Sequence, residues 1–194
     1  MKHRDLIDRL MSEVSKQMPE RRWKHTLGVV SSAMKLAERY GDDPEKAELA
    51  AVLHDVAKFW PVDKQRDTIM EEGLHLDVLD YDKELWHAHA GAYVARRDYG
   101  VADAEVLNAI RYHTSGRVGM SRLEKIICLA DYIEPGREFP GVDNLRRLSE
   151  ESLEEALLAG FDGTISFLME KRKRIYPLTV LTRNDLILSL TQEA

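Results

Sequence analysis

A histidine and an aspartate lie side by side inside an apolar run, and this pair constrains the chain more than any other feature. The run extends from Leu49 to Phe59 and places His54 and Asp55 among leucine, alanine and valine side chains. Burying both polar groups without partners costs several kcal/mol, so a protein core does not normally accept them. A metal cation offsets this cost, because the carboxylate keeps its charge and the imidazole donates a lone pair. The pair therefore points to a metal site.

A lysine on the same predicted helix indicates the charge of the substrate. The helix is predicted to begin at Pro44 and to end before Pro61. Lys58 lies four residues after His54 and three after Asp55, so all three are predicted to project from one helix face. A cation beside a metal site favours an anionic substrate.

Other histidines and one further aspartate fall on predicted inward helix faces or at helix ends. His25 lies on the apolar face of a helix predicted over 23–40, and His113 ends the apolar stripe of another helix. Asp131 lies on the apolar stripe of a helix that a capping box at Ser121 begins. Alone, His25 fits a hydrogen-bonded core histidine and Asp131 fits a buried salt bridge, and both explanations stay open at this point.

Two histidines, His87 and His89, share a helix predicted over 83–99, and helical periodicity does not separate them. His87 shares its side of the helix with Gly91, where the missing side chain lets another helix or a ligand approach closely. Either histidine therefore remains a candidate ligand, and the other belongs on the helix surface or behind the ligands.

The combined donor set of four histidines and two carboxylates suits a first-row transition metal better than calcium or magnesium, which prefer oxygen ligands. The chain has no G-x-x-x-x-G-K-[ST] loop and no serine or cysteine nucleophile signature. A metal centre can generate hydroxide from water near neutral pH. Hydrolysis by a metal-activated hydroxide is therefore the simplest mechanism that these residues support.

The candidate residues belong to segments whose order along the chain is informative. These segments are Arg22-Trp-Lys-His25, Leu53-His-Asp-Val-Ala-Lys58, Leu85-Trp-His87, Arg111-Tyr-His113-Thr114, Leu129-Ala-Asp131-Tyr-Ile-Glu-Pro-Gly-Arg137 and Tyr176-Pro-Leu-Thr-Val-Leu-Thr-Arg-Asn184. The ordered set resembles the HD-domain metal-dependent phosphohydrolases and, more narrowly, the bacterial symmetrical bis(5'-nucleosyl)-tetraphosphatases. The resemblance covers about residues 22–184, which is nearly the whole chain.

This resemblance implies an all-α fold, a single HD-domain helical bundle over residues 1–194 with a metal site between the central helices. The core is expected over about residues 22–134, with C-terminal helices over 145–190 packing on it. The last of these helices is predicted to be short, over 184–190, because Pro177 breaks the preceding helical pattern. No alternating strand pattern competes with the helices.

The resemblance also implies roles for single residues. Metal ligands are implied at His25, His54, Asp55, His87, His113 and Asp131, which favours His87 over His89. The minimal set for one metal omits His87 and His113, and these two make a second metal feasible, with Asp55 as the bridge. Catalytic roles are expected for Asp55 and Lys58, and substrate contacts for Lys58, Thr114, Arg137 and Arg174. The implied cofactor is a divalent transition metal, namely iron, with manganese or another divalent ion as a substitute, at one or two ions per chain.

The activity implied by the resemblance is that of a symmetrical bis(5'-nucleosyl)-tetraphosphatase, which hydrolyses diadenosine tetraphosphate to two ADP. Two alternatives keep the metal site: another HD-domain hydrolase of a nucleoside monophosphate or signalling nucleotide, and a metal-containing nucleotide-binding sensor. A third alternative, an α-helical interaction protein with core histidines, predicts no bound metal.

Composition limits the partners and the compartment. The net charge of −6 argues against a nucleic-acid polymer as partner. The single cysteine, Cys128, excludes an intrachain disulfide, and it is expected to be a small buried hydrophobe in a reducing compartment. No signal peptide and no apolar run of membrane-spanning length is found, so a cytoplasmic protein without a membrane partner is expected. The sequence leaves a homodimer open.

Overall fold

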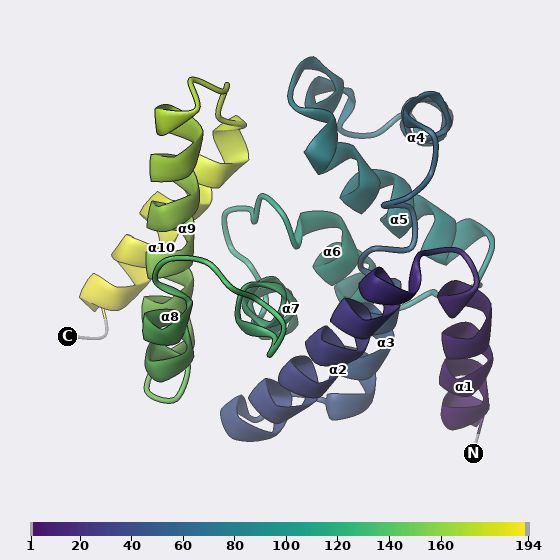
Figure 1. The fold of residues 1–194 in the computed structure, drawn as a ribbon, viewed down its shortest axis with the longest axis horizontal. Coiled ribbons are helices and arrows are strands. Elements are labelled where there is room, and N and C mark those ends of the chain that lie inside the picture. Colours follow the sequence, from purple (N-terminus) through teal and green to yellow (C-terminus); the bar gives the residue numbers. More distant parts are fainter. Residues whose placement is uncertain (1, 193–194) are drawn as a thin grey trace.

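The regular structure of the chain is helical throughout the part that the computed structural model describes, residues 2–192 (Figure 1). The α-helices are α1 (Lys2–Ser15), α2 (Glu20–Tyr40), α3 (Pro44–Leu53), α4 (Val62–Glu72), α5 (Trp86–Arg97), α6 (Ala104–Tyr112), α7 (Arg122–Ile133), α8 (Val142–Leu148), α9 (Leu153–Glu170) and α10 (Pro177–Gln192). Two short 3₁₀ helices, η1 (Leu76–Asp80) and η2 (Lys83–Leu85), precede α5. No strand occurs within residues 2–192, and this confirms the predicted all-α class.

Local capping signals set the beginnings of several helices. The Asp43 side chain accepts hydrogen bonds from the first backbone N–H groups of α3, and Pro44 occupies the first helical position, where its missing N–H costs nothing. At α7, Ser121 and Glu124 form the predicted capping box in both directions. These helices therefore begin where the sequence predicts.

Removing the cap of α7 should cost a measurable part of the stability. We expect Ser121→Ala to lower the free energy of unfolding by about 1 kcal/mol, because the Glu124 backbone N–H loses its acceptor. Urea denaturation followed by circular dichroism measures this change. Ser12→Ala is the matched control on the exposed side of α1, and its effect should stay within about 0.5 kcal/mol. Equal losses in the two variants would contradict the capping role.

The end of α3 differs from the prediction. The α-helix stops at Leu53, and the chain continues to Trp60 through turns, so the predicted extension to Pro61 was wrong. The His54 Nδ1 atom lies 2.6 Å from the Ala51 carbonyl oxygen. If the helix continued, this oxygen would accept from the Asp55 backbone N–H. The histidine side chain thus replaces a backbone donor, and the helix ends there. His54 and Lys58 consequently do not share a helix face.

The last helix also differs, because α10 begins at Pro177 rather than at Asn184. The sequence pattern treats Pro177 as a helix breaker, which was wrong. Proline is tolerated in the first turn of a helix, where its ring presets the backbone and no N–H is needed.

Helix α7 lies at the centre of the molecule, between the N-terminal helices and the C-terminal ones (Figure 1). On one side it packs against α2, α3 and α6, and on the other side it packs against α8 and α9. Phe161 on α9 is completely buried and meets the Tyr132 ring of α7 edge to face. A single domain, with a core over about 22–134 and C-terminal helices packed on it, stays a prediction. A single cooperative unfolding transition would support it.

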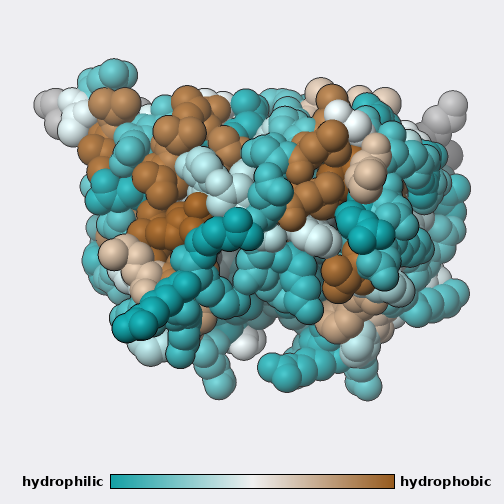
Figure 2. All heavy atoms as spheres, turned by 90° about the horizontal axis from the view of Figure 1, so that it is seen from above, coloured by the Kyte–Doolittle hydropathy of each residue, from teal (hydrophilic) through white to brown (hydrophobic). Residues whose placement is uncertain are grey.

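The surface and the interior agree with the composition. Cys128 is buried, as predicted, and burial raises the pKa of its thiol above the ordinary value. Polar side chains cover much of the face in Figure 2, with apolar patches between them. Within residues 2–192, no helix combines the length and the apolar character that crossing a bilayer requires.

Candidate metal centre

Imidazole and carboxylate groups from five segments converge where the central helices meet. The segments and residues are α2 with His25, the turn after α3 with His54 and Asp55, α5 with His87, the end of α6 with His113, and α7 with Asp131. All six predicted metal ligands therefore lie in one cluster.

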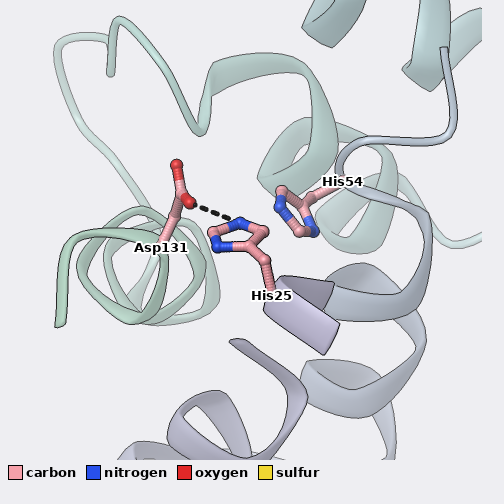
Figure 3. A group of neighbouring side chains, drawn as sticks. All are labelled: His25, His54 and Asp131. Atoms are coloured by element: carbon pink, nitrogen blue, oxygen red, sulfur yellow. Dashed lines mark ion pairs between the residues drawn. The ribbon is translucent and has the colours of Figure 1, made fainter. Parts of the chain in front are cut away.

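The first part of the cluster joins α2 to α7. Figure 3 shows His25 between Asp131 and His54, with its Nε2 atom 3.0 Å from Asp131 Oδ1. The His25 and His54 ring centroids are 5.7 Å apart. Burial opposes ionisation of Asp131, but the adjacent His25 ring and the charge of Arg137 hold the pKa of the carboxyl well below its usual value. Asp131 is therefore a carboxylate at neutral pH.

The second part of the cluster surrounds Asp55. Its carboxylate oxygens lie 3.2 Å from His54 Nε2, 3.0 Å from His87 Nε2 and 3.8 Å from His113 Nε2. Burial lowers the pKa of His54, and it lowers the pKa of His87 and of His113 to about 3. These imidazoles are therefore neutral at physiological pH, and each keeps one ring nitrogen with a lone pair.

Hydrogen bonds on the far side of three rings decide which nitrogen faces the cluster. The Nδ1 atoms of His54 and His113 lie 2.6 and 2.8 Å from the backbone carbonyl oxygen three residues earlier. The Nδ1 atom of His25 lies 3.0 Å from Glu134 Oε1. Because carbonyl and carboxylate oxygens only accept, Nδ1 carries the proton in all three rings. The lone pair is then on Nε2, which faces the cluster.

His87 has a different environment. Its Nδ1 atom lies 3.4 Å from Lys58 Nζ, which is a donor, and its Nε2 atom lies 3.0 Å from Asp55 Oδ1. The His87 Nε2 atom also lies 3.2 Å from His113 Nε2, whose lone pair can accept, so this arrangement favours a proton on His87 Nε2. His87 thus reaches the cluster but does not present a free lone pair there as the other three histidines do.

The donor atoms fit a bound cation. Among the residues that the structure describes, His25 Nε2, His54 Nε2 and Asp55 Oδ1 are buried without a hydrogen-bond partner, a costly arrangement unless a ligand satisfies them. Two groups, one of His25, His54 and Asp131 and one of His54, Asp55 and His113, hold their donor atoms within 4.8 Å of one another. Tight sets of nitrogen and oxygen donors are typical of transition-metal sites.

The structure separates the two histidines of α5. His89 lies away from the cluster, with its ring centroid 5.6 Å from that of His75 and 6.2 Å from that of Tyr112. Consecutive residues on a helix are rotated by about 100°, so positions 87 and 89 face different neighbours. Only tertiary packing shows that His87 faces Asp55.

The predicted phosphate-binding residues divide into two groups. Lys58 pairs with Glu84 at 2.7 Å and lies 3.4 Å from His87 Nδ1, and Arg137 donates to the Asp131 backbone oxygen at 2.7 Å and pairs with its carboxylate, so both cations border the cluster. Thr114 directly follows His113 in sequence, and its Oγ1 atom is buried with no hydrogen-bond partner in the described part of the chain.

Arg174 lies against an aromatic ring instead of a cluster residue. Its guanidinium carbon is 5.5 Å from the Tyr81 ring centroid, and the neighbouring Lys173 pairs with Asp82 at 2.8 Å. This basic segment is therefore tied to the chain around η1 and η2.

Two functional neighbours escaped the sequence analysis. Glu134 is buried and accepts from His25 Nδ1 at 3.0 Å and from the Gly136 backbone N–H at 2.7 Å. A Cβ atom at Gly28 would collide with the Glu134 carboxylate, so this glycine gives the carboxylate room. Arg22 pairs with Asp55. The available signal was spacing, because Glu134 follows Asp131 by three residues on one helix end.

Glu134 orients a candidate ligand, so its charge should matter for metal affinity. We expect Glu134→Gln to weaken metal binding roughly 10-fold, near the lower end of the range for partners of ligating histidines, because the amide oxygen can still accept from His25. Competition with a chelator measures the affinity. Glu150→Gln, on an exposed acid paired with Arg39, is the control and should not change it. Unchanged affinity in Glu134→Gln would contradict the orienting role.

Comparison with known proteins agrees with this geometry. The HD domain family profile matches residues 22–136. The chain is 50% identical over 174 residues to the symmetrical bis(5'-nucleosyl)-tetraphosphatase of Bacillus subtilis (strain 168), covering 90% of this chain and 94% of the relative. The corresponding Staphylococcus aureus protein is 39% identical over 90% of this chain and 91% of its own length.

A solved structure supports the same assignment. The crystal structure of a predicted HD superfamily hydrolase involved in NAD metabolism from Clostridium acetobutylicum superposes with a TM-score of 0.90. The two chains are 43% identical, and the match covers 94% of this chain and 97% of the other. The clustered histidines and aspartates thus lie in a fold shared with these relatives, and the chain belongs to the HD-domain family and, within it, to the symmetrical bis(5'-nucleosyl)-tetraphosphatases.

Proposed function

We propose that this protein is a metal-dependent hydrolase that cleaves diadenosine tetraphosphate at its centre and releases two ADP. The relatives carry the name of this activity, which supports the substrate class. The main support for metal-dependent hydrolysis is the buried set of donor atoms on His25, His54 and Asp55 that lack partners among the described residues. The cations Lys58 and Arg137 lie at the border of this set.

The metal is held, in this proposal, by His25, His54, Asp55 and Asp131, with His113 adding a donor for a second ion. Imidazole nitrogens mixed with carboxylates suit iron, and also manganese or another divalent transition metal. One or two ions per chain are expected, since the two donor groups share His54. A cytoplasmic location is proposed from the single buried cysteine, which fits a reducing compartment.

A bound divalent metal supplies Lewis acidity, which activates water and neutralises phosphoryl charge. The protein side chains supply the positioning. Lys58, after α3, and Arg137, after α7, border the cluster and bind phosphate oxygens in this proposal. An arginine can do so through two N–H groups. Arg22 pairs directly with the Asp55 carboxylate. Glu134 holds the His25 ring in its orientation.

Product analysis tests the proposed reaction. The anaerobically purified protein, with its metal content measured, is incubated with diadenosine tetraphosphate, and the nucleotides are separated by chromatography. We expect ADP as the sole product, at two molecules per substrate consumed. AMP together with ATP would contradict symmetrical cleavage, and no turnover by metal-loaded protein would contradict the activity altogether.

A further inference from the structure

A pocket of about 260 Å³ adjoins the candidate metal centre on the side of His87. Its lining includes His87 and Lys58, which belong to the cluster and to its phosphate-binding border. It also includes Phe59 and Trp60, which directly follow Lys58 in the chain. If the phosphates of a substrate lie on Lys58, the group attached to those phosphates can therefore reach this pocket.

The aromatic side chains of the pocket differ in what already covers them. Lys64 Nζ lies over the Trp60 ring, 3.3 Å from its centroid, and Trp60 also packs against both apolar clusters of the interior. Phe59 is 50% exposed, although a large apolar side chain gains free energy from burial. A half-exposed phenylalanine at a pocket beside a phosphate-binding lysine offers a stacking surface for a planar ligand.

A polar group in the pocket lining also lacks a partner. Gln65 is 6% exposed, and its Nε2 atom donates to the Trp60 carbonyl oxygen at 3.0 Å. This bond fixes the orientation of the amide, and the Gln65 Oε1 atom is left buried without a hydrogen-bond partner among residues 2–192. Such an acceptor is costly to leave unsatisfied. An N–H group on the edge of a base removes that cost.

We propose that this pocket binds the purine base of one half of the substrate, stacked on Phe59, while the adjoining phosphates lie on Lys58. The inference rests on the proposed function, since it assigns a subsite to that substrate. The ligand class follows from the lining, which combines a flat apolar surface with a buried acceptor, next to a cation. Phosphate groups alone would not use Phe59.

Binding of ADP and of pyrophosphate to the metal-containing protein, measured by calorimetry, tests this subsite. We expect Phe59→Ala to weaken ADP binding about 5- to 100-fold, the range for loss of one base–aromatic stack, and to leave pyrophosphate binding unchanged. Phe59→Tyr keeps an aromatic surface and should retain most of the ADP affinity. Phe167→Ala, on a phenylalanine that is 52% exposed on α9 and outside the pocket lining, is the matched control and should bind both ligands normally.

The outcomes separate the subsite from the proposed activity. Equal weakening of ADP and pyrophosphate in Phe59→Ala, or no weakening of either, would overturn the base subsite. If ADP affinity depends on Phe59 but the protein releases no ADP from diadenosine tetraphosphate, the subsite is supported and the proposed function is contradicted. If the wild type and Phe59→Ala both release ADP with the same KM, the proposed function is supported and the subsite is contradicted.

Discussion

Asp55→Asn is expected to lose its bound metal and to lower turnover by more than about 100-fold. This loss should exceed the roughly 10- to 100-fold loss of affinity or activity that follows when a residue hydrogen-bonded to a metal ligand is changed. The carboxylate is buried, its oxygens face His54, His87 and His113, and within residues 2–192 its Oδ1 atom has no hydrogen-bond partner. Asparagine keeps the shape but removes the charge that a cation needs. Metal analysis and product chromatography on the same sample measure the two losses.

The control for this variant must separate loss of metal from loss of the fold. Asp98→Asn, on an exposed acid that pairs with Arg97, should retain full metal content and activity. Because Asp55 also pairs with Arg22, the urea midpoint of Asp55→Asn is measured as well. A folded Asp55→Asn protein with normal metal and turnover would refute the proposed ligand set.

Lys58→Ala is expected to lower kcat about 100-fold while metal content stays at the wild-type level. The lysine borders the cluster, 3.4 Å from His87 Nδ1, and it carries a cation that stabilises the charge developing on the phosphoryl group. The side chain donates no lone pair to the metal while it is protonated, so its removal leaves the ligands in place. Steady-state kinetics with parallel metal analysis measure the two properties.

Lys46→Ala provides the matched control for Lys58. Lys46 pairs with Glu105 at 2.7 Å, the same distance as between Lys58 and Glu84, but its partners lie outside the cluster. Its removal should leave kcat unchanged. Loss of metal together with activity in Lys58→Ala would indicate that the lysine maintains the site structure, and unchanged kcat would remove it from the mechanism.

Local signals predicted most of the helices because their information is contained within a few residues. The capping box at Ser121 and the cap at Asp43 satisfy backbone N–H groups of the helix that each begins, whatever packs around them. The same holds for Gly41, whose positive φ ends α2 at Tyr40, where the helix predicted over 23–40 also ends. Local patterns reach their limit at the end of α3 and the beginning of α10, where the His54 ring takes a backbone acceptor and Pro177 begins a helix instead of breaking one.

The end of α3 shows this limit clearly. The apolar run continues past Leu53 to Phe59, and periodicity alone extends the helix with it. In the structure, the His54 ring takes the Ala51 carbonyl, and Asp55 pairs with Arg22 on another helix. The His54 contact with Ala51 is local, but Arg22 and Asp55 come from different segments, and no short window of sequence contains that pair.

The sequence by itself determined which residue types are available for chemistry and the all-α class, because buried His-Asp pairs and helix caps act locally. Tertiary structure alone decided that His87 rather than His89 faces Asp55, that Glu134 orients His25, and that Phe59 lies at a pocket beside Lys58. The physical reason is distance along the chain. These contacts join segments up to 109 residues apart, and only the packing of the helices brings their side chains within a few ångströms.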